Sequence, residues 1–262
     1  MSNKNSKDGK WLKEIGISRI AVLSAAVIIG GLTTFGCSNA PTNSTAANNT
    51  TNTVSTTTAN KTAVVNSATP AVNTSTEKVP VPLSDAGEYG ENTYDMAKAN
   101  NWTKAAEKLH ELKQSQSQLA GANIKSAELD QTIAALDKDV AAKDQLATLR
   151  DANQVTFVVA DLTAKYNPPI PVEVTKLDYY GRELEIWSMA KDEAKLKSTA
   201  QAIRQTWDAV KPKVEAKGGA KQAQNFETLV AKTDAAQNVS DYAKAATPIL
   251  DEVDNLEKVF EK

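Results

Sequence analysis

From Ser84 to the end of the chain, apolar residues recur every three or four positions, the spacing of one helix face. The clearest runs are Ala105, Leu109, Leu112, Gln116 and Leu119; Leu129, Ile133, Leu136 and Val140; Leu196, Ala200, Ile203, Trp207 and Val210; and Ile249, Val253, Leu256 and Phe260. Residues 155–159 could alternate as a strand, but they also fit the helical pattern of their neighbours. We therefore predict an all-α fold, an antiparallel helical bundle of about four long helices plus short ones.

Capping and helix-breaking residues divide this pattern into segments. Asn100-Asn101 begins a long helix that ends near Leu119, and Ser126 is a suitable N-cap for the next helix. Residues 167–171, read as NPPIP, form a stiff crossover. The remaining boundaries are Gly218-Gly219, which closes a helix, Ser240-Asp241, which opens the last one, and Pro212 and Pro248, which should kink helices or reset their starts.

The two parts of this region resemble each other. Tyr89-Gly90, Ala99 and Lys104 match Tyr180-Gly181, Ala190 and Lys195 at a shift of 91 positions. Near the end of each part, Ala152, Val155, Val159 and Leu162 match Ala246, Ile249, Val253 and Leu256 at a shift of 94. These matches predict two repeated helical halves, 84–166 and 174–262. Chance alignment of Ala-rich helices is the alternative.

The N-terminal residues follow the order of an export signal. Basic residues from Lys4 to Arg19 precede an apolar stretch at 20–32, which is shorter than the roughly 20 residues of a membrane-spanning helix. The following residues, Leu32-Thr33-Thr34-Phe35-Gly36-Cys37, resemble a bacterial lipobox. Thr34 stands where that family usually has an aliphatic residue, and an uncleaved signal anchor is the alternative.

The resemblance to bacterial lipoproteins implies a signal peptide at 1–36 and lipid attachment, as palmitate or a related acyl chain, at Cys37. Two or three acyl chains would hold the chain stably on the extracytoplasmic face of the cell membrane. Residues 37–82 are rich in Ser, Thr, Asn and Ala and have no periodicity, so we expect a disordered linker. The helical domain is expected at 83–262. It resembles uncharacterised helical domains of other bacterial lipoproteins, although no motif names a family.

Composition excludes several function classes. The net charge of −2 and the pI near 5.6 argue against a nucleic-acid partner. Cys37 is the only cysteine, which excludes a disulfide or thiolate cluster within one chain. No phosphate-binding loop, nucleophile–base spacing or metal signature is present, so we expect no catalytic residues, no metal site and no cofactor.

The most unusual segment is 177–187, read as LDYYGRELEIW. Its aromatic and charged side chains are candidates for binding a small anionic or sugar-like ligand in a groove between the halves. These candidate residues are Tyr179, Tyr180, Arg182, Glu183, Glu185 and Trp187. Alternatively, the same aromatic residues close the junction where the second half begins, and the arginine pairs with an acid.

Other polar residues favour ordinary structural roles. His110 has no metal-ligand spacing around it and reads as a half-exposed helix residue. Asp251, Asp254 and Glu257 could contribute to a cation site, but a charge run on a helix is usually its solvated side. Trp102 and Trp207 sit inside helical patterns and are expected in the core.

These features favour a membrane-anchored, non-enzymatic lipoprotein with a helical binding or interaction domain. The expected partners are the membrane, through the lipid on Cys37, and a protein, cell-wall or small-molecule partner. The alternative is a solute- or metal-binding lipoprotein that serves a transporter or a sensor.

Overall fold

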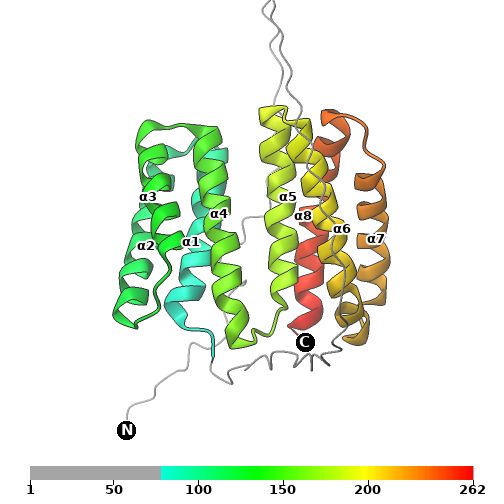
Figure 1. Ribbon diagram of the computed structural model, residues 1–262, viewed down its shortest axis with the longest axis horizontal. Helices are drawn as coiled ribbons and strands as arrows, with labels where there is room; N and C mark the ends of the chain where they lie inside the picture. Colours follow the sequence, from blue (N-terminus) through cyan, green and yellow to red (C-terminus); the bar gives the residue numbers. More distant parts are fainter. Residues whose placement is uncertain (1–77, 262) are drawn as a thin grey trace, which may run out of the picture. The chain divides into compact units, whose positions relative to one another are not determined.

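The computed structural model describes residues 78–261, which form eight α-helices and one short 3₁₀ segment (Figure 1). The expected signal peptide, Cys37 and residues 38–77 of the linker lie outside the described residues. The helices are α1 (Val81–Lys98), α2 (Trp102–Gly121), α3 (Ala127–Ala142), α4 (Gln145–Thr163), α5 (Val172–Ala190), α6 (Glu193–Ala216), α7 (Ala220–Asp234) and α8 (Val239–Phe260), with η1 (Ala164–Tyr166) after α4.

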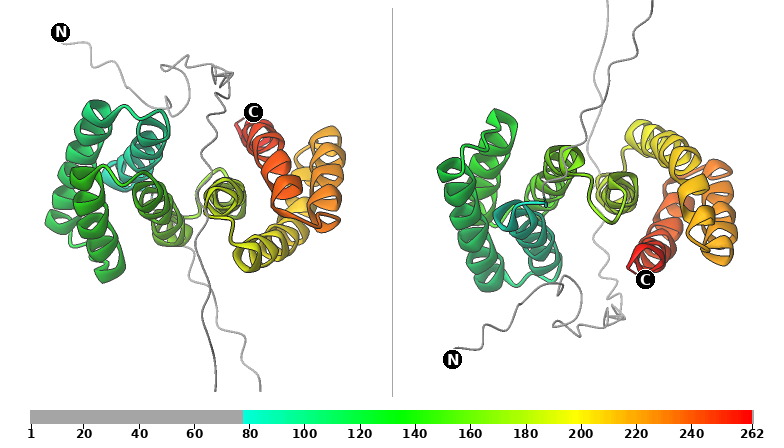
Figure 2. Two further views of the ribbon diagram at one scale, coloured as in Figure 1. Left: turned by 90° about the horizontal axis from the view of Figure 1, so that it is seen from above. Right: turned by 90° about the horizontal axis from the view of Figure 1, so that it is seen from below.

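The helices form two four-helix halves joined by the crossover at 167–171. In the first half α1 packs on α2 and α4, and α3 packs on α4. In the second half α5 packs on α6 and α8, and α7 packs on α8. The halves meet along α4 and α5, which lie side by side in both views of Figure 2.

The prediction of an all-α bundle is confirmed, and residues 155–159 belong to helix α4. The number of long helices is larger than predicted, because all eight α-helices span 15 residues or more, including α1 with 18 and α5 with 19. Small and polar residues supply much of the buried face of α1: Ser84, Ala86, Gly87, Gly90, Thr93 and Ala97. The apolar period that marks a long helix is consequently weak there.

Helix ends follow local capping chemistry. The side chains of Asn101 and Ser126 accept hydrogen bonds from backbone N–H groups of the first turns of α2 and α3, as expected. Asn238 caps α8, two residues before the predicted start. Pro82, expected in the linker, instead lies in the first turn of α1, where a missing N–H costs no helical bond.

Two prolines lie inside helices. Pro212 and Pro248 lie inside α6 and α8 and do not reset the starts of these helices. Both prolines are exposed, as are Asp208 and Lys244, the residues whose carbonyl groups lose a helical partner. These carbonyl groups can therefore be hydrated, which lowers the cost of a proline inside a helix.

The equivalent helices of the two halves begin with equivalent residues. Pro80 and Pro171, 91 positions apart, are the N-caps of α1 and α5. Asp144 and Asn238, 94 positions apart, cap α4 and α8 through their side chains. The two sequence shifts thus connect helices that occupy corresponding places in the two halves.

A close helix contact also occurs in both halves. A Cβ atom at Gly90 of α1 would lie 2.9 Å from Val155 Cγ1 of α4. In the second half, a Cβ atom at Gly181 of α5 would lie 2.6 Å from Leu250 Cδ2 and 3.3 Å from Ile249 Cγ2 of α8. Glycine is needed at both positions because the helices approach closely there.

Each half has its own apolar core, and α5 contributes to both cores. Val174, Leu177 and Leu184 of α5 are fully buried in the second core, whereas the neighbouring Ile186 is fully buried in the first. Trp187 packs against both cores. Helix α5 is therefore the element that joins the two halves. In residues 78–261 no helix is both long and apolar enough to cross a membrane.

We expect Gly90→Ala and Gly181→Ala to lower the free energy of unfolding by about 1–2 kcal/mol, because the added methyl group overpacks a close helix contact. Gly121→Ala is the matched control, since no atom lies within 4 Å of the position its Cβ would take. That change should be neutral or stabilise by up to about 1 kcal/mol through helix propensity. Urea denaturation measures all three variants, and equal effects would contradict the close contacts.

Candidate functional site

Arg182 of α5 lies at the centre of the junction between the halves. Only 6% of the residue is exposed. Its Nη2 atom lies 3.0 Å from Asp178 Oδ2 and 3.5 Å from Glu91 Oε2 of α1. The guanidinium also lies 5.1 Å from the ring centroid of Tyr94, a cation–π distance. Burial lowers the pKa of Arg182, but the surrounding carboxylates outweigh this and raise it above its ordinary value.

Glu185 joins the same two helices. Its carboxylate accepts a 2.9 Å hydrogen bond from the Tyr94 hydroxyl and pairs with Lys98 Nζ at 2.5 Å. Both partners belong to α1, and Glu185 belongs to α5. The candidate arginine and glutamate therefore make polar contacts between the two halves.

Glu183 faces α4 and is 8% exposed. Its carboxylate accepts hydrogen bonds from the Trp187 indole N–H and from the Asn153 side chain. Burial raises the pKa of Glu183, although these two hydrogen bonds oppose the rise. The Asn153 amide also donates a 3.0 Å hydrogen bond to the Tyr179 carbonyl, which fastens α4 to α5.

The two candidate tyrosines form an aromatic cluster with Phe157 of α4. The ring centroid of Phe157 lies 4.7 Å from that of Tyr179 and 6.5 Å from that of Tyr180. The two tyrosine rings lie 5.1 Å apart in an edge arrangement. Burial raises the pKa values of both tyrosine hydroxyls. All three rings are half-buried, so the cluster covers the α4–α5 contact.

All six candidate residues are thus assembled at the junction, and their polar groups contact other parts of the chain. These contacts agree with the alternative stated above, in which the segment closes the junction between the halves. Arg182 pairs with an acid, as that alternative expects, and the pairing connects the two halves. Ligand binding by this segment stays a prediction.

The junction contains more carboxylates than cations. Glu257 of α8 faces it and, with Glu91, Asp178 and Arg182, forms what we call the acid cluster. Burial and repulsion from Asp178 and Glu91 raise the pKa of Glu257 to about 8. Partial burial and repulsion from Asp178 and Asp95 also raise the pKa of Glu91 above its ordinary value, despite the opposing effect of Arg182. Asp95, Asp254 and Glu261 add further negative charge at this place.

Of the acids of α8 that could have formed a cation site, Glu257 faces the acid cluster and Asp254 adds charge to it, whereas Asp251 is exposed. In residues 78–261 no group of three or more His, Cys, Asp or Glu side chains is placed to hold a metal ion.

A groove of about 490 Å³ lies between α2 and α3, and the sequence did not predict it. Its floor is formed by Leu109 and Val140, which are only 4% and 6% exposed. The other lining residues are Trp102, Thr103, Ala106, His110, Lys113, Asp137, Ala141 and Lys143. The volume falls within the range of roughly 300–1,000 Å³ that is typical of small-molecule sites.

Two residues at this groove differ from expectation. Trp102, expected in the core, is half-buried and packs at the edge of the first core, because it is the first residue of α2. His110 is exposed rather than half-exposed, and one ring nitrogen lies 2.9 Å from the Gln114 side-chain nitrogen. An indole at the start of a helix, followed one turn later by exposed alanine, is the signal that could have indicated the groove.

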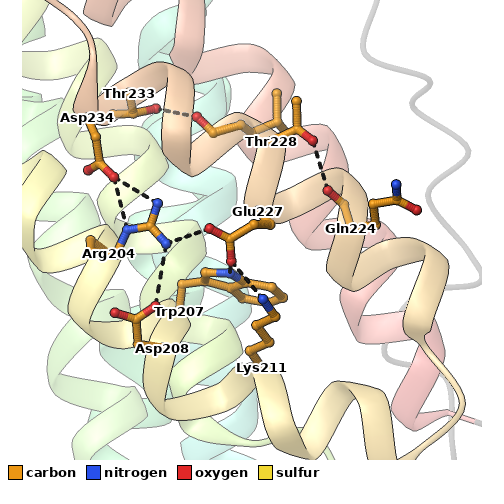
Figure 3. Close-up of polar contacts among 10 residues, drawn as sticks. Arg204, Trp207, Asp208, Lys211, Gln224, Glu227, Thr228, Thr233 and Asp234 are labelled. Carbon is orange, nitrogen blue, oxygen red and sulfur yellow. Dashed lines mark hydrogen bonds and ion pairs between the residues drawn. The ribbon is translucent and has the colours of Figure 1, made fainter.

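The helices of the second half that correspond to α2 and α3 are α6 and α7, and charged residues connect them (Figure 3). Glu227 accepts hydrogen bonds from Arg204 at 2.7 Å and from the indole N–H of Trp207 and Lys211 Nζ at 2.9 Å. These three donors lower the pKa of Glu227 to about 2. Arg204 also contacts Asp234 Oδ2 through two nitrogens, at 2.8 and 2.9 Å. Trp207 is fully buried, as its helical register predicts.

Comparison with known proteins adds no relative. No protein-family model matches the chain, and no curated protein and no solved structure matches it.

We expect the acid cluster to make stability depend on pH. The folded-state pKa of Glu257, about 8, lies above its ordinary value of 4.5, so the folded state binds more protons between these values. The free energy of unfolding should therefore fall as pH rises from 5 to 8. Glu257→Gln removes this titration. Its effect on the free energy of unfolding should therefore be more stabilising at pH 8 than at pH 5, by about 1 kcal/mol or more.

The control is Glu215→Gln, which changes an exposed carboxylate on α6. Its effect on the free energy of unfolding should be the same at both pH values. Thermal denaturation from pH 5 to pH 8 measures the two variants. If Glu257→Gln has the same effect at pH 5 and pH 8, Glu257 does not titrate in this range.

Proposed function

We propose that this chain is a lipid-anchored, extracytoplasmic and non-enzymatic binding protein. The export-signal pattern and the Cys37 motif support the anchor. The observation that carries the binding role is the groove between α2 and α3, where an indole, a buried apolar floor and charged groups line one hollow. A site with an apolar lining and a few placed polar groups is typical of ligand recognition.

The packing of the halves supports a binding role for a preformed surface. Two apolar cores and the polar contacts of Arg182, Glu185 and Asn153 hold α1, α4 and α5 together. Binding to a preformed surface loses less conformational entropy than binding that orders a flexible segment. In this proposal the residues before the helical domain act as a tether between domain and membrane.

The lipid anchor is tested by metabolic labelling with an alkyne fatty acid in a bacterial host. The wild-type chain should incorporate the label and partition with membranes, and Cys37→Ser should abolish the incorporation. Cys37 is the only cysteine, so no other thiol can carry the lipid. Full labelling of Cys37→Ser would exclude attachment at this residue.

Native mass spectrometry distinguishes an interaction module from the alternative, a solute- or metal-binding lipoprotein. The protein is purified from membranes without added metal or chelator, and its native mass is compared with its denatured mass. We expect the two masses to agree once lipids are accounted for, because most residues that line the groove are exposed and a weakly held small molecule is lost during purification. A discrete excess mass that is lost on denaturation would favour the solute- or metal-binding alternative and identify the ligand class.

A further inference from the structure

The groove between α2 and α3 is specific to the first half. Lys113 of α2 corresponds to Arg204 of α6 at the shift of 91, and Ala141 of α3 corresponds to Asp234 of α7 when the first residues of these helices, Ala127 and Ala220, are aligned. In the second half Arg204 and Asp234 form an ion pair across α6 and α7 (Figure 3). The first half has the small, exposed Ala141 in the place of Asp234, and Ala141 lines the groove.

One end of the groove is apolar. The half-buried Trp102 indole lies beside the floor formed by Leu109 and Val140. Ala106 and Ala141 are exposed on the two walls, and their small side chains leave the floor accessible. Such a surface can bind an aromatic or bulky aliphatic group, because an indole face and buried aliphatic groups exclude water from it.

The polar side of the groove has a surplus of positive charge. Asp137 is the carboxylate of the lining, and it is already paired with Lys113 at 2.9 Å. Lys143 is exposed at the groove, and it has no ion-pair partner within residues 78–261. An acidic group placed here would therefore gain a cation without displacing an existing ion pair.

We propose that this groove binds a small organic anion, with an apolar body on Trp102 and a carboxylate or phosphate group on Lys143. This inference rests on the proposed function, since it names the ligand class of the same groove. Lys143 is the C-cap of α3 in the left-handed conformation, with φ of 55°. Its backbone position is held by hydrogen bonds from its own N–H and from the N–H of Asp144 to the last turn of α3.

The test uses the full chain in phosphatidylcholine nanodiscs, with empty nanodiscs as the background, and equilibrium dialysis of two probes. The first probe is 1-naphthaleneacetate, and the second is its neutral isostere 1-naphthaleneacetamide. Because the two share one apolar body, the ratio of their affinities reports the recognition of charge. We expect the acetate to bind about tenfold more tightly than the acetamide, a difference of about 1.4 kcal/mol.

Two variants locate the binding. Lys143→Gln should weaken acetate binding about tenfold and leave acetamide binding unchanged. Lys191→Gln is the matched control, because Lys191 caps α5 with almost the same backbone geometry, φ of 56°, and is also exposed. Ala141→Leu should abolish binding of both probes by filling the groove, with stability retained because leucine is a good helix former.

The inference is overturned if the two probes bind equally, if neither saturates, or if Lys191→Gln weakens binding as much as Lys143→Gln. Binding that persists in Ala141→Leu would place the ligand elsewhere and would overturn it too. These outcomes are separate from the tests of the proposed function. An anchored protein that carries another discrete ligand would disprove this ligand class alone, whereas unlabelled Cys37 would disprove the anchor alone.

Discussion

The burial of Arg182 is the constraint on which the arrangement of the two halves depends. A guanidinium cannot lose its charge at any ordinary pH, so burying it is costly unless acids or other hydrogen-bond acceptors pair with it. Here the acids come from α5 itself and from α1 of the other half. Ile186, four residues further along α5, enters the apolar core of the first half. One helix therefore makes both a charged and an apolar contact across the junction.

The two networks of charged residues, around Glu227 and around Arg182, shift carboxylate pKa values in opposite directions. Around Glu227 three donors meet one carboxylate, so its ionised form is stabilised at every physiological pH. Around Arg182, burial and repulsion between neighbouring carboxylates raise the pKa values of Glu91 and Glu257, and that of Glu257 reaches about 8. The first network fastens two helices within one half. We expect the second to make the stability of the junction between the halves depend on pH.

The two halves use one helical plan and differ in their surfaces. Both depend on a glycine where the first helix of the half crosses the last. Within that shared frame, the second half connects its middle helices with a dense ion-pair network (Figure 3), whereas the first half leaves a groove with a single ion pair, Lys113–Asp137, at its side. Substitutions on the exposed faces of the outer helices can change the surface in this way because the glycine contacts lie between other helices, α1 with α4 and α5 with α8.

The sequence by itself determined the helical class, the caps at Asn101 and Ser126 and the buried register of Trp207, because these features depend on residues within a few positions of each other. It also set the unusual composition of 177–187. Only the tertiary structure decided what that segment contacts, since Tyr94 and Glu185 meet across 91 positions of sequence. The full length of α1, the raised pKa of Glu257 and the groove beside Trp102 were likewise decided by packing. Each depends on which side chains from distant helices displace water, and no local pattern encodes that.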